Sequence, residues 1–66
     1  MTQITGQVEN ISQAVVSGNT IYYFMIDGSV YKADINLHDG LPFVEVGSDI
    51  SGEVNENNEF RVINLD

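Results

Sequence analysis

The run NTIYYFMIDGSVYKADI, Asn19 to Ile35, places a turn signal between two stretches rich in strand-forming residues. Asp27-Gly28 is a strong hairpin signal, because a type I′ turn needs positive φ at both central positions. Gly adopts that conformation freely and Asp tolerates it. A two-residue loop also fixes the pairing, so that Ile26 lies opposite Ser29 and each step along the strands pairs the next two residues. The sequence therefore predicts an antiparallel hairpin of known register.

The two faces of this hairpin differ in character. One face carries no charge and pairs two aromatic residues across the strands, so we expect it to be the core. The core face comprises Tyr22, Phe24, Ile26, Tyr31, Ala33 and Ile35. The opposite face is amphipathic, and we expect it to bind a partner. This candidate face comprises Ile21, Tyr23, Met25, Val30 and Lys32, with Asp34 at its end.

Three things can cover the candidate face. The chain's own loop 36–47 can fold over it, with Leu41, Phe43 and Val44 as the packing residues. Another protein or a second copy of the chain can dock there, because monomers seldom leave such apolar strips bare. A nucleic acid or a small ligand is the third possibility. The sequence leaves all three open.

The rest of the chain is also typical of an all-β protein. No window repeats its apolar residues with helical spacing, and Val, Ile, Tyr and Phe are abundant. Turn signals divide the chain at 17–19, 27–28, 39–42, 47–48 and 55–58. We expect strands over Gln3 to Val16, Thr20 to Ile26, Ser29 to Ile35, Asp49 to Val54 and Glu59 to Asn64, and at most one helical turn in loop 36–47.

The first of these strands is long, and we expect a kink or bulge near residues 10–12. Before the kink, one inward face carries Ile4, Gly6 and Val8. After it, Ala14 and Val16 are expected to point inward again. The strand would then bend around the core.

The segment VEVGSDISGEVNENNEFRVINL resembles the last hairpin of OB-fold domains, in which one Gly opens the fourth strand and another lies within it. Gly47 and Gly52 match these two glycines, and ITGQVENI resembles the glycine-containing opening of such a first strand. The resemblance implies a single domain, 1–66, folded as a small five-stranded antiparallel β-barrel, with an SH3-like barrel as the alternative. The inward residues it implies are Ile50, Val54, Phe60, Val62 and Leu65.

In OB-fold proteins the second and third strands form the customary ligand face. The resemblance thus implies that Tyr23 stacks on a base while Lys32 contacts a phosphate. The charge of the chain argues against nucleic-acid binding. The chain has ten acidic residues but only two cations, Lys32 and Arg61, and its net charge is −8. Nucleic-acid binders hold phosphates through many cations. An acidic chain is better suited to a basic protein partner.

The composition of the chain bears on the cellular location of the protein. The chain has no Cys, which excludes disulfides and thiolate metal sites. Its first residues have neither a basic nor an apolar leader region, and no apolar stretch reaches the roughly 20 residues of a membrane helix. We expect a cytoplasmic protein that does not contact membranes.

Chemistry-bearing residues are few. His38 lies beside Asp39 and four residues after Asp34, but no nucleophile accompanies it, as general base catalysis would require. The same region resembles a calcium loop, yet Gly40 comes one residue late and no flanking helices are expected. We therefore expect no enzyme activity, no cofactor and no specific metal site.

Three functions follow from these observations. The first is a non-enzymatic binding module that contacts a protein partner, or another copy of itself, through the candidate face. The second is a single-stranded nucleic-acid-binding OB-fold protein. The third is an acidic mimic of nucleic acid that inhibits a DNA-binding protein.

Overall fold

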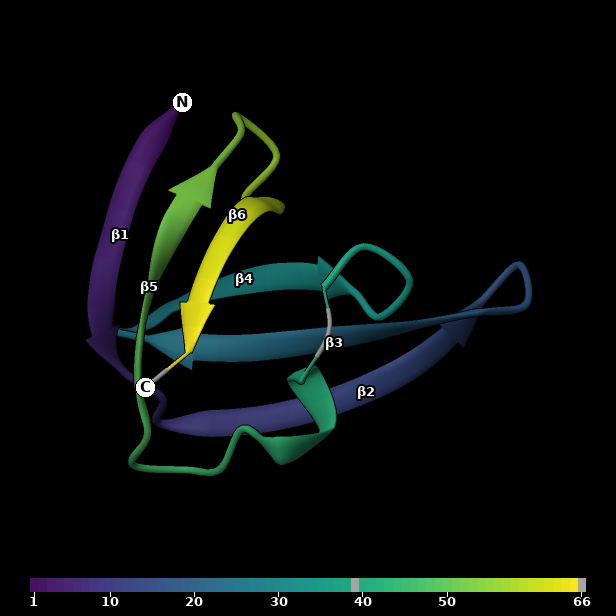
Figure 1. The fold of residues 1–66 in the computed structure, drawn as a ribbon, viewed down its shortest axis with the longest axis horizontal. Coiled ribbons are helices and arrows are strands. Elements are labelled where there is room, and N and C mark those ends of the chain that lie inside the picture. The colour runs from purple at the N-terminus through teal and green to yellow at the C-terminus, as the bar shows by residue number, and fades with distance from the viewer. Residues whose placement is uncertain (39, 66) are drawn as a thin grey trace.

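The computed structural model describes residues 1–38 and 40–65, and it is all-β apart from one short helix (Figure 1). The expectation of an all-β chain is confirmed. The elements are β1 (Thr2–Gln7), β2 (Asn10–Val16), β3 (Asn19–Ile26), β4 (Ser29–Asp34), the 3₁₀ turn η1 (Leu41–Phe43), β5 (Asp49–Val54) and β6 (Phe60–Leu65). The strands pair as two antiparallel three-stranded sheets, β1-β5-β6 and β2-β3-β4.

The expected closed five-stranded barrel is wrong. The two sheets stay open, and among the described residues the β-bridge between their β4 and β6 edges is an isolated parallel one that pairs Lys32 with Glu59. The Lys32 N–H donates to the Asn58 carbonyl over 2.8 Å at this point. The bridge lies one residue before β6 begins at Phe60, and no ladder between β4 and β6 follows it in the described residues.

The prediction of a single long first strand is also wrong, because the chain passes from one sheet to the other between two neighbouring residues. Val8 donates to the Ser48 carbonyl over 2.9 Å and accepts from Gly47 N–H over 2.7 Å. The next residue, Glu9, donates to Met25 of β3 over 2.7 Å. Neighbouring residues thus bond to different sheets, and β2 begins with its faces reversed.

That reversal explains a second correction. Ala14 and Val16 do not point inward, since they lie opposite Ile21 and Asn19 and are exposed. Ile11, opposite Phe24, packs against the core instead.

The β3–β4 hairpin agrees with the predicted register at every pair, from Ile26 and Ser29 to Ile21 and Asp34. Asp27 has φ 52° and Gly28 has φ 79°, as a type I′ turn requires. The predicted core face is confirmed at Phe24, Ile26 and Ala33, which are buried, while Tyr22 and Tyr31 are partly buried and pack against them. Ile35 is half-buried and is not a member of the core cluster. The turn residues therefore predict the register of this hairpin.

The core lies between the two sheets. Its fully buried members are Val8, Phe24, Ile26, Ala33, Leu41, Ile50, Val54 and Phe60. The rings of Tyr31 and Phe60 join the sheets, with centroids 5.8 Å apart at 48°. Ile50, Val54 and Phe60 are therefore inward, as the OB resemblance implied.

Val62 is not inward: it is 44% exposed, and Ile63 packs against the core in its place. The cause is a bulge in β6, because Val54 pairs with Phe60 while the adjacent Glu53 pairs with Val62. Arg61 is left without an opposite residue, and the inward positions shift by one. The side chain of Leu65 lies outside the described residues.

The connection from β4 to β5 contains the expected single helical turn, η1. Leu41 at its start is fully buried in the core, and Val44 after it packs against the same cluster. Within residues 1–38 and 40–65 no helix has the length and apolar character needed to cross a bilayer.

Candidate functional site

The candidate face lies on the outer side of the β2-β3-β4 sheet, opposite the core. Met25 and Val30 are cross-strand partners near the β3–β4 turn, and Tyr23 pairs with Lys32 further along. Val30 is 47% exposed, and Ile21, Tyr23, Met25 and Lys32 are half-buried. The structure thus places all the predicted site residues on one surface.

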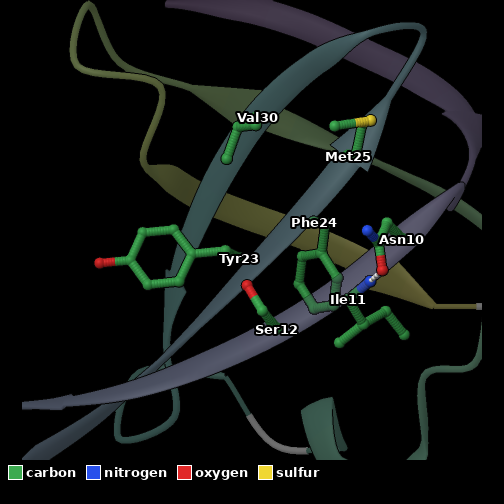
Figure 2. A pocket seen from close by; sticks show the side chains of 7 residues that line it. All are labelled: Asn10, Ile11, Ser12, Tyr23, Phe24, Met25 and Val30. Carbon is green, nitrogen blue, oxygen red and sulfur yellow. Dashed lines mark hydrogen bonds between the residues drawn. The ribbon is translucent and has the colours of Figure 1, made fainter.

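Two polar residues of β2 extend this surface. Ser12 lies opposite Tyr23, and Asn10 lies opposite Met25. Together with Tyr23, Met25 and Val30 they surround a shallow pocket of about 60 Å³, shown in Figure 2. The Asn10 side chain is held by a 2.8 Å hydrogen bond that its Oδ1 accepts from the Ile11 N–H. The pocket therefore combines an aromatic ring, two apolar side chains and small polar groups.

The loop 36–47 does not lie over this pocket. Leu41 and Val44 pack into the core on the other side of the sheet, and Phe43 is 85% exposed to solvent. Leu37 lines a pocket with Ile21 at the far end of the candidate face. Of the loop residues that the structure describes, 36–38 and 40–47, none therefore lines the pocket at the centre of the face.

A second pocket, of about 260 Å³, opens where β4 and β6 separate. Both cations of the chain, Lys32 and Arg61, line it. Asp34 and Glu59 line it too, so the two positive charges are matched by two negative ones. The β6 bulge at Arg61 places this side chain at the pocket.

The turn before β6 holds the edge of β4 in place. Asn55 Oδ1 accepts from the N–H groups of Asn57, over 2.9 Å, and Glu59, over 3.0 Å. This shapes the turn so that Asn58 can bond twice to β4. Its carbonyl accepts from the Lys32 N–H, and its Nδ2 donates to the Val30 carbonyl over 3.3 Å. The Asn-rich turn is therefore a clasp between the sheets as well as a hairpin turn.

His38 has a structural role. Its ring is buried, and Nε2 donates to the Phe60 carbonyl over 3.1 Å, which ties the loop to β6. This bond fixes the proton on Nε2 in the neutral ring. Asp39, its expected orienting partner, lies outside the described residues. In the described part of the chain, no three His, Cys, Asp or Glu side chains come together as a metal site.

Sequence reasoning missed part of the site. The contribution of Asn10 and Ser12 depends on the break before β2, and the position of Arg61 depends on the bulge in β6. Neither irregularity has a local turn signal. The Ser17-Gly18 turn does have a local signal. If this turn is read as a two-residue hairpin loop, its register places Ser12 opposite Tyr23, as the structure has it.

Comparison with known proteins adds no relative: no protein-family model, no curated protein and no solved structure matches this chain.

Proposed function

We propose that this chain is a non-enzymatic binding module whose candidate face contacts a protein partner. The observation that carries the proposal is the pocket lined by Tyr23, Met25 and Val30, which the chain's own loop leaves open. Exposed apolar surface of this kind, rimmed by polar residues, is typical of protein contact sites. Tyr and Met are also enriched where proteins bind one another.

The proposal includes an OB-like architecture, in the form of a partly open barrel. Two features support it. The sheets are connected at one pair of edges by the parallel bridge at Lys32 and at the other by the chain itself, through Val8 and Glu9. Gly52, buried in β5, also matches the glycine that the OB resemblance places there. An SH3-like barrel is the alternative.

A basic partner fits the charge of the chain. With a net charge of −8, the molecule attracts cationic surfaces over long range and repels anionic ones. One such partner would be a nucleic-acid-binding enzyme that this chain blocks by acting as an acidic mimic of nucleic acid. Its complex would weaken steeply as salt is added, because the attraction is screened.

Partner capture with matched variants tests the proposal. The immobilised wild-type chain should retain a protein that Tyr23→Ala fails to retain, since the substitution removes the ring at the pocket. Val46→Ser is the control, because Val46 is an apolar residue of the loop, 63% exposed, that does not line the pocket. The proposal is wrong if Tyr23→Ala retains the same proteins and leaves the oligomeric state unchanged.

Single-strand nucleic-acid binding is the second candidate, favoured by the gathering of Lys32 and Arg61 at one pocket beside Ile21. Tyr23, which faces Lys32 across the strands, would supply the stacking ring. A fluorescent oligonucleotide titrated at about 50 mM salt tests this, because phosphate contacts are strong at low salt. Absence of binding under that condition excludes the candidate.

A further inference from the structure

The outer edge of β2 combines an end-strand position with two exposed valines. β2 pairs with β3 on one side only, because it is the end strand of its sheet. Its seven residues, NISQAVV, contain no charge although the chain carries −8 overall. Val15 is 73% and Val16 50% exposed. In Figure 1 the tip of the β2–β3 hairpin extends beyond the β1-β5-β6 sheet, and residues 13–16 of β2 are exposed.

The turn geometry shows which backbone groups of β2 are free. Val16 and Asn19 flank the two-residue turn Ser17-Gly18, so they form a hydrogen-bonded pair, and such pairs alternate along the ladder. The backbone groups of Ile11, Gln13 and Val15 therefore point away from β3. The β3–β4 hairpin follows the same rule, since Lys32 of β4 points its N–H away from β3 and bonds to Asn58.

Among the described residues, no other backbone group bonds to Gln13 or Val15 on this side. The Ile11 N–H is an exception within the strand, because the Asn10 side chain accepts it. Unpaired N–H and C=O groups on an uncharged, exposed edge are a template for another strand.

We propose that β2 pairs in an antiparallel manner with β2 of a second copy of this chain, about a two-fold axis at Gln13. The free N–H and C=O groups of Gln13 then bond to those of Gln13 in the second copy. Val15 N–H bonds to the Ile11 carbonyl across the axis. The proposal is independent of the proposed function, since it uses the edge of the sheet and not its outer face.

Side-chain chemistry favours a second copy over an unrelated peptide. In this register Ile11 lies opposite Val15 of the second copy, and both residues are aliphatic. Ser12 lies opposite Ala14, and both residues are small. Gln13 meets Gln13, and each amide can donate to and accept from the other. Cross-strand pairs of like character stabilise a sheet, and no charge faces another.

The other edge of the sheet explains why pairing stops at a dimer. Asn58 occupies β4 by bonding to Lys32 and Val30, so no further strand can add there. A contact that uses the same edge of both copies is closed by its two-fold axis. The product is one continuous six-stranded sheet.

Charges introduced at Gln13, on the two-fold axis, test the dimer. Gln13→Lys and Gln13→Glu each place like charges opposite one another and should each weaken association about tenfold or more. An equal mixture of the two variants should associate at least as well as the wild type, because opposite charges then meet. Mass measured by sedimentation over a concentration series is the readout. The rescue also shows that both variants are folded.

Two controls make the result specific. Thr5→Lys and Thr5→Glu charge the exposed edge strand β1, which the proposed pairing does not use, and should leave association unchanged. Added salt should strengthen the dimer, since both copies carry −8. A wild-type chain that stays monomeric at millimolar concentration and moderate salt overturns the proposal, and so does a mixture of Gln13 variants without rescue.

Discussion

Gly52 lies at the closest approach between β5 and β6. A Cβ at this position would collide with the Val62 carbonyl oxygen and would lie 3.0 Å from the Phe60 ring. It would also come within 3.1 Å of the Ile63 Cα, so two of its three nearest neighbours are backbone atoms that cannot rotate away. The identity of this residue is therefore set by the spacing of two strands.

Gly52→Ala should lower the free energy of unfolding by about 1–3 kcal/mol, because one added methyl group overpacks the interface. Urea denaturation followed by circular dichroism measures the change. The neighbouring Ser51→Ala is the matched control and should stay within about 0.5 kcal/mol of the wild type. Equal stabilities of the two variants would show that β6 moves away at little cost.

Asp27 provides a second test at the residue scale, because its φ of 52° is unfavourable for a β-branched side chain. Asp27→Val should reduce the free energy of unfolding by about 1–2 kcal/mol. Asp27→Asn should be nearly neutral, since Asn tolerates this conformation. Thermal unfolding of both variants decides the matter, and a tolerated Val would contradict a type I′ turn.

Among the elements, the register of the β3–β4 hairpin was predictable and the break in the first strand was not. Asp27-Gly28 sets the hairpin register through two residues that are adjacent in sequence. The break at Val8 and Glu9 depends on bonds to Ser48, Gly47 and Met25, which are distant in sequence. Periodicity can identify the inward face of a strand only until such a break reverses it, which is why Ala14 and Val16 were assigned to the wrong face.

The same reason explains the error in the last strand. Alternation from Phe60 makes Val62 inward, but the bulge at Arg61 moves that position to Ile63. Bulges carry no reliable local signal when the residue involved is not Gly. The candidate face was therefore predictable on β3 and β4, while the pocket that joins Lys32 to Arg61 was not.

The clasp formed by the 55–59 turn is testable as an element. Asn58 has φ 59° and also donates to the Val30 carbonyl. Asn58→Ala should cost about 1–2 kcal/mol, because it loses the bond and replaces Asn, which tolerates the left-handed conformation, with a residue that does not. Asn58→Gly loses only the bond and should cost less.

Hydrogen exchange locates the effect of these variants. The Lys32 amide, bonded to the Asn58 carbonyl, should exchange faster in Asn58→Ala than in the wild type, while the Phe24 amide in the centre of its sheet stays protected. Unchanged exchange at Lys32 would mean that the clasp does not hold the β4 edge.

At the scale of the whole molecule, excess negative charge opposes folding. Ten acidic residues are distributed over 66 positions with only two cations, so compaction brings like charges together. The two cations share one pocket with Asp34 and Glu59, and two positive charges cannot compensate ten negative ones. Small domains also bury a modest fraction of their surface, so this repulsion is large relative to the total stability.

Raising the salt concentration from about 0.01 M to about 0.15 M shortens the screening length from about 30 Å to about 8 Å. The Tm should rise, and each 1 kcal/mol of relieved repulsion corresponds to about 4–8 °C for a domain of this size. Calorimetry in sodium chloride and in choline chloride should give the same rise. An effect of one salt alone would indicate specific ion binding.

The hydrogen bond from His38 to the Phe60 carbonyl gives the molecule a built-in spectroscopic probe. His38 is the only imidazole in the chain, so its ring resonances need no assignment by mutagenesis. The proton on Nε2 is shielded from water by burial and by its acceptor, which slows its exchange. A single imino signal in the NMR spectrum therefore reports, without labelling, whether the loop and the last strand remain docked when a partner binds or when two copies associate.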